Sequence, residues 1–188
     1  MKDVPLRCAC GAVHGIAVSV SPGSGMRVVC YCDDCQRFAH YLGREDILDA
    51  YGGTEVFQMP PANVKITQGA EQIRCIRLTP KGLHRWYTAC CRTPIGNTLS
   101  AAGPFVGVIH NFIGDEHLRE ANLGPVRGYV QTRFALSSLP VEREQGFPWR
   151  LIVISLWKLL AWKLKGKNRP SPFFDENGRP VSEPDILS

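Results

Sequence analysis

Cys30-Tyr31-Cys32-Asp33-Asp34-Cys35 is the stretch around which this chain of 188 residues is organised. Its C-x-C-x-x-C spacing lets alternate backbone positions turn two thiolates to one side, while a tight turn adds the third. Three thiolates from one short loop are suitable ligands for a tetrahedral zinc ion. No cysteine or histidine follows before His40, so we expect an open fourth position. Such a position can hold water, a thiol or a substrate oxygen, as in catalytic zinc sites.

Three other states of the triplet stay open as alternatives: a zinc site closed by a distant cysteine, a disulfide, and free reduced thiols. A disulfide is disfavoured because Cys30 and Cys32 are too close in sequence for an easy bridge. The N-terminal residues also lack the apolar run of a secretory signal. Metal binding is therefore the favoured interpretation.

The composition is that of an ordinary globular protein, with 44% hydrophobic and 21% charged residues. The eight cysteines are unusual, and seven fall into three tight groups: Cys8/Cys10, Cys30/Cys32/Cys35 and Cys90/Cys91. This clustering indicates metal binding in a reducing compartment, so we expect a cytoplasmic protein. Cys75 stands alone and is interpreted as a buried, small apolar residue.

The charge pattern argues against two classes of partner. The formal charge is only +5, and no basic arm interleaved with aromatic residues is present, so nucleic-acid binding is not expected. No stretch reaches the roughly 20 apolar residues that a membrane-spanning helix needs.

Short alternating stretches separated by glycine and proline turns predict a mainly β domain of mostly antiparallel strands over residues 1–130. The expected strands lie at 13–20, 26–29, 55–59, 64–67, 72–78, 83–88 and 105–113. Residues 36–42 and 46–51 are expected to be short helical pieces.

Two metal sites are predicted rather than one. The Cys8/Cys10 pair cannot complete a tetrahedron, and Cys90/Cys91 is the other available group. A structural zinc held by these four cysteines would tie the ends of the β domain together and stabilise the fold. Cys30, Cys32 and Cys35 are then left as the second metal site and the predicted catalytic centre.

The ordered motifs C-A-C-G (8–11), C-Y-C-D-D-C (30–35) and C-C-R-T-P-I (90–95) resemble the glutathione-dependent formaldehyde-activating enzyme family, which includes centromere protein V. The resemblance covers residues 6–115. It implies a β-tent fold of short antiparallel strands, one structural zinc and a second zinc held by the C-x-C-x-x-C thiolates. It also implies a carbon–sulfur lyase activity that joins glutathione and formaldehyde as S-hydroxymethylglutathione, or releases them from it.

The chain departs from the family pattern at three places. The family closes its structural site with C-x-x-C-G, whereas Thr88 stands at the first cysteine position and Arg92 replaces the glycine. Cys91 fits the second cysteine, and the extra Cys90 is expected to replace the missing ligand. Tyr31 occupies the position of a frequent family histidine.

Other polar and aromatic residues near the closing cysteines are candidates for lining a cleft: His84, Trp86, Tyr87, Arg92, Asn97 and His110. For each of them a structural position in the core or in a turn is the favoured alternative. Asp33 and Asp34 are candidates for supporting the metal site or for acting as a general base. A simple turn role is the favoured alternative.

The C-terminal extension, residues 131–188, is predicted to contain a helix at about 148–166 and a mobile tail at 168–188 in which residues 172–174 dock. Pro148, the closing lysines and Gly166 favour the helix. Most of its circumference is apolar, and its lysines and tryptophans suit a membrane interface. Packing on the β domain or pairing with a second copy is the alternative, and it is the favoured interpretation.

The leading hypothesis is a cytoplasmic protein with two zinc ions that acts on a small thiol substrate such as a glutathione adduct. The alternative is a non-catalytic zinc module that uses the helix at 148–166 for a membrane surface, a protein partner or a homo-oligomer. A third hypothesis, a redox or zinc-storage protein, predicts a triplet that oxidises readily.

Overall fold

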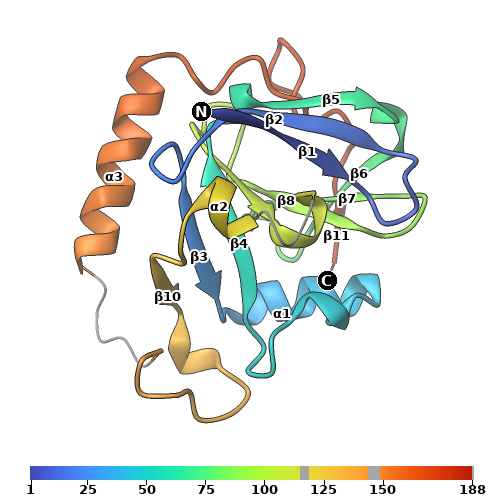
Figure 1. Ribbon diagram of the computed structural model, residues 1–188. Helices are drawn as coiled ribbons and strands as arrows, with labels where there is room; N and C mark the ends of the chain where they lie inside the picture. The colour runs from blue at the N-terminus through green and yellow to red at the C-terminus, as the bar shows by residue number, and fades with distance from the viewer. Residues whose placement is uncertain (115–118, 144–148, 188) are drawn as a thin grey trace.

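The computed structural model describes residues 1–114, 119–143 and 149–187, which form two β-sheets with helices around them (Figure 1). The smaller sheet has the order β1 (Lys2–Arg7), β2 (His14–Val20), β5 (Val64–Gln68). The larger sheet has the order β10 (Gly128–Val130), β3 (Met26–Cys30), β4 (Thr54–Met59), β9 (Val106–Ile109), β8 (Pro94–Thr98), β7 (His84–Thr88), β6 (Ile73–Arg77), β11 (Asp185–Ile186). Only the edge strands β10 and β11 pair in parallel among these described strands.

The described helices are α1 (Asp33–Leu42), α2 (Arg119–Leu123) and α3 (Trp149–Leu164). The predicted mainly β fold of short strands with a C-terminal helix is therefore confirmed. Strand β1 was not predicted, because Pro5 interrupts the alternation of Val4 and Leu6. A proline is tolerated there because β1 is an edge strand.

Two predicted elements differ in the structure. Residues 46–51 do not form a helix, and only a 3-10 turn at Glu45–Ile47 is present. The Asp49 carboxylate accepts the backbone N–H groups of Tyr51 and Gly53, so the chain turns instead of continuing helically. The strand expected at 105–113 ends at Ile109, where a 3-10 turn (His110–Phe112) begins.

The two faces of the larger sheet are covered differently. Phe57 and Val108 point into a core shared with the smaller sheet. On the opposite face, Val56 and Ile109 pack in one cluster with Phe38 of α1. Helix α1 thus covers one face and the smaller sheet the other, which places the β3–α1 junction on the α1 side.

The C-terminal residues pack against the larger sheet. Phe173 is fully buried, and its ring lies 5.1 Å from that of Trp86. Strand β11 pairs with β6 further along. The docking expected at residues 172–174 is present. The segment 168–188 was interpreted as a mobile tail, but it is packed, because these aromatic rings fill the core beside β7. The domain boundary near residue 130 stays a prediction.

Candidate metal centres

The first cysteine cluster lies where two hairpin turns meet. Cys8 and Cys10 belong to the turn between β1 and β2, and Cys90 and Cys91 to the turn between β7 and β8. The four Sγ atoms all lie within 4.8 Å of one another. Because the two turns come from different sheets, a metal ion here would connect the sheets directly.

The spacing of these sulfurs fits a zinc ion. The Sγ–Sγ distances are 3.6 Å for Cys8–Cys10, 3.8 Å for Cys8–Cys90, 3.4 Å for Cys10–Cys90 and 3.8 Å for Cys90–Cys91. Four sulfurs at about 2.3 Å from a tetrahedral zinc are about 3.8 Å apart. The cluster therefore has the ligand number and dimensions of a closed, four-thiolate site.

The turn that carries Cys8 is held by its own backbone. The Cys8 N–H donates to the Val13 carbonyl, and the Gly11 N–H donates to the Cys8 carbonyl. The Val13 N–H donates to the Cys8 Sγ at 3.2 Å, which helps to fix the position of this sulfur. Gly11 has a φ of +75°, a conformation that residues with a Cβ rarely adopt. The turn is thus preorganised to present sulfur.

Two threonine hydroxyls surround Cys91. The buried Thr88 and Thr93 place Oγ1 atoms 3.4 Å and 3.1 Å from its Sγ. Burial raises the pKa of Cys91, but hydrogen bonds with Thr88 and Thr93 outweigh it and lower the pKa to about 5. Arg92 has a φ of +54°, a left-handed conformation that residues other than glycine rarely adopt.

The second cluster lies at the start of α1. Cys30 ends β3, Cys32 is the N-cap of α1, and Cys35 lies in the first helical turn. The three Sγ atoms lie within 4.8 Å of one another, with Cys32 and Cys35 3.2 Å apart. The third cysteine is thus brought in by the helix start and not by a tight turn. The positive end of the helix dipole favours thiolates at this position.

Three sulfurs so close together cannot easily ionise without a cation. Hydrogen bonds from Cys30 and Cys35 lower the pKa of Cys32 to about 2. The same contacts, to Cys32 first and then to Cys35, raise the pKa of Cys30 well above its usual range, with burial adding to the effect. One thiolate is thus stabilised by two thiols, and a divalent cation would be needed to hold all three as thiolates.

Arg85, which the sequence reasoning did not select, lies beside this cluster. Its side chain is only 1% exposed, and Nη1 lies 3.9 Å from the Cys35 Sγ. The guanidinium also donates to Asn97 Oδ1 at 3.3 Å and to Asp34 Oδ2 at 3.3 Å. Three thiolates with one Zn²⁺ carry one net negative charge, which the guanidinium would offset. The sequence offers one signal for this residue, an arginine between His84 and Trp86 in the predicted strand at 83–88.

The other predicted residues divide between this site and the core. Asn97 and Asp34 contact Arg85, whereas Asp33 is exposed. Tyr31 is buried in a cluster with Val29 and Leu139, and its hydroxyl donates to Asp49 at 3.0 Å.

The remaining candidates lie in the core or at other parts of the surface. His84 stacks on Trp86, and both belong with the tail phenylalanines. Arg92 lies over the ring of Tyr41, a residue of α1, and His110 lines a separate cavity. Cys75 is buried, as expected.

Comparison with known proteins gives a family and a distant structural match. A family model described as a family of unknown function (DUF6151) matches residues 1–185. No curated protein matches the chain. Among solved structures, the chain is similar to a crystal structure of a Rhodobacter sphaeroides protein, with 17% identity and a TM-score of 0.45. That match covers 65% of this chain and 96% of the other.

Proposed function

The chain belongs to DUF6151, a family of unknown function, and we propose that it binds two zinc ions, one structural and one open to a small thiol ligand. The four-cysteine cluster would hold the structural ion, and Cys30, Cys32 and Cys35 the open one. Both assignments rest on the clustering of the sulfurs.

The contrast between the two clusters carries this proposal. Four sulfurs at tetrahedral spacing leave no room for a further ligand, whereas the second cluster gathers three. A three-thiolate site next to a buried guanidinium suits an anionic fourth ligand such as a thiolate. Arg85, fixed by Asn97 and Asp34, would orient that ligand and offset its charge.

The substrate class follows from the motif resemblance. Glutathione-dependent formaldehyde-activating enzymes act on a thiol–formaldehyde adduct, and we propose a carbon–sulfur lyase activity on such an adduct here. Zinc bound at the triplet would act as a Lewis acid toward the sulfur or the hydroxymethyl oxygen. The chain's own contribution would be to hold the adduct beside Arg85 and to offset the negative charge of the three thiolates and the bound zinc.

Cobalt substitution tests the open position. Cobalt(II) replaces zinc in thiolate sites and reports its ligands by visible absorption, so adding glutathione should change the spectrum of the cobalt protein. Cys32→Ser should remove that response, and Cys8→Ser should leave it in place. A spectrum unaffected by glutathione would contradict the open site and favour the non-catalytic module. Oxidation of the triplet with metal release under mild peroxide would favour a redox or storage role.

A second candidate function is supported by the exposed side of α3. Large apolar side chains face outward, including Leu156 (60% exposed), Trp157 (71%) and Leu164 (78%). Residues 149–174 contain no acidic residue but six basic ones: Arg150, Lys158, Lys163, Lys165, Lys167 and Arg169. This combination suits the surface of an anionic membrane. We propose peripheral membrane binding through α3; none of the described helices is long and apolar enough to cross a bilayer.

A further inference from the structure

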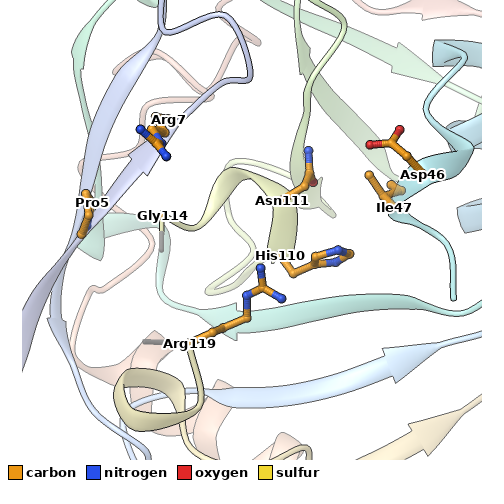
Figure 2. Close-up of a pocket in the computed structure, with 8 residues that line it drawn as sticks. All are labelled: Pro5, Arg7, Asp46, Ile47, His110, Asn111, Gly114 and Arg119. Carbon is orange, nitrogen blue, oxygen red and sulfur yellow. The ribbon is translucent and has the colours of Figure 1, made fainter. Parts of the chain in front are cut away.

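A separate cavity lies beside the 3-10 turn at His110–Phe112, and none of the seven clustered cysteines lines it. Its volume is about 820 Å³, within the roughly 300–1,000 Å³ of small-molecule sites. Arg7 comes from β1, Asn111 from the 3-10 turn and Arg119 from the start of α2. Figure 2 shows these three side chains, from separate segments, around one opening.

Two of these side chains carry polar atoms that the described residues do not satisfy. Asn111 Oδ1 and Nδ2 and Arg119 Nε are shielded from solvent and have no hydrogen-bond partner in the described parts of the chain. Buried polar atoms in folded proteins are normally paired, because leaving them unpaired costs free energy. Both side chains line the cavity, so a ligand bound there is a candidate partner for these atoms.

The charge of the cavity favours an anion. Arg7 and Arg119 contribute two positive charges. Asp46 also lines the cavity, but both of its oxygens accept hydrogen bonds from Arg44, at 2.7 and 2.8 Å. His110 donates from Nδ1 to the Glu55 carbonyl at 3.2 Å, which fixes the orientation of its ring. With Asp46 paired to Arg44, the charges of Arg7 and Arg119 leave the cavity positively charged.

We propose that this cavity binds a small organic anion that carries a phosphate or carboxylate group next to a hydroxyl. The guanidinium groups of Arg119 and Arg7 pair with the oxyanion, as planar donors do with such groups. The Asn111 amide requires both an acceptor and a donor, since Nδ2 and Oδ1 are both unpaired. A hydroxyl beside the oxyanion supplies the donor for Oδ1.

The experiment is calorimetric titration of the full-length, zinc-loaded protein with four probes: glycerol 3-phosphate, malate, sulfate and glycerol. Saturable one-to-one binding of glycerol 3-phosphate or malate is expected. The probe that binds more tightly shows whether the cavity prefers a phosphate or a carboxylate. Sulfate, which offers no hydroxyl donor, should bind more weakly, and neutral glycerol should not bind.

Variants locate the binding. Arg119→Gln and Asn111→Leu should each lower the binding affinity for the preferred probe about tenfold or more. Arg37→Gln, which removes the same charge from an exposed position of α1, should have no effect. Arg7→Gln provides the test if Asn111→Leu fails to fold. Absence of saturable binding up to about 10 mM, which is weaker than any specific small-molecule site requires, or binding unaffected by Arg119→Gln, would overturn the proposal.

Discussion

Thr88 shows at the level of a single residue how this chain gathers four sulfurs without the first cysteine of the C-x-x-C-G motif that it resembles. Its buried hydroxyl lies 3.4 Å from the Cys91 Sγ and accepts the Thr93 N–H at 3.1 Å. Cys90, which is exposed, reaches the Sγ atoms of both Cys8 and Cys10 from the other side. Cys90 thus supplies the fourth sulfur in place of a cysteine at position 88, and Thr88 is a hydrogen-bonding partner of Cys91.

A rescue experiment tests this exchange. Cys90→Ser should remove one ligand and weaken zinc binding at the first site, whereas Thr88→Cys in the same chain should restore it, because a thiol at position 88 faces Cys91. The measurement is zinc retention against a chelator. Thr88→Ser with Cys90→Ser is the matched control and should not rescue. Full zinc retention by Cys90→Ser alone would show that Cys90 is not a ligand.

Arg85 is the residue on which the second site depends most beyond its cysteines. Replacing it by methionine removes the buried positive charge near Cys35, so zinc affinity at the triplet should fall about tenfold or more. Chelator competition on the weaker of the two zinc sites measures the change. Arg37→Met, on the exposed side of α1, should leave the affinity unchanged. Equal affinities for the two variants would contradict the electrostatic role of Arg85.

At the scale of elements, α3 is attached to the rest of the molecule by one side only. Leu151 packs against the cluster beneath α1, and Lys158 donates to the Gly23 carbonyl at 2.6 Å. The outward side remains apolar, with none of the helix's described residues fully buried. The helix is thus fixed in place while its apolar surface is left available.

The outward side of α3 is expected to be the membrane-binding surface. Leu156→Glu with Trp157→Glu should abolish sedimentation with vesicles rich in phosphatidylserine, because two charges replace interfacial apolar groups. Thr67→Glu with Gln68→Glu makes the same charge change on exposed positions of β5 and should retain binding. A different result would contradict membrane binding: wild-type protein that does not sediment with such vesicles but forms dimers, which Leu156→Glu with Trp157→Glu disrupts. The outward side of α3 would then contact a second copy of the chain.

The features that could be predicted from the sequence are those defined by local residue spacing. Cysteine spacing was enough to pair Cys8/Cys10 with Cys90/Cys91, because few sulfurs were available, and alternation was enough for most strands. Arg85 could not be found this way, since it meets Cys35 only through the packing of β7 on α1. The anion cavity also depends on contacts between distant segments. The turn at Asp49 was missed because a side-chain hydrogen bond overrode a helical pattern.

At the scale of the whole molecule, both the first metal site and the C-terminal segment join distant parts of the chain. The site connects the hairpin of the smaller sheet to that of the larger sheet. Phe173 and Phe174 enter the core that the two sheets share. The global stability of the fold should therefore depend on residues from both ends of the sequence.

The packing of the C-terminal segment predicts a large mutational effect. Phe173→Ala should lower the free energy of unfolding by about 3–5 kcal/mol, because it leaves a cavity against Trp86. Urea unfolding of the zinc-loaded protein measures this loss. Phe134→Ala, at a ring that is 40% exposed, is the control and should cost far less. A loss at Phe173 no larger than at Phe134 would show that the segment is not part of the core in solution.

Zinc content with X-ray absorption at the zinc edge is the most direct measurement of the two-site arrangement. Reduced, freshly purified protein should contain two zinc ions per chain, with an average coordination between three and four sulfurs. Cys32→Ser with Cys35→Ser should leave one zinc bound by four sulfurs. A protein without transition metal, or a double variant that still holds two zinc ions, would contradict the assignment of both clusters.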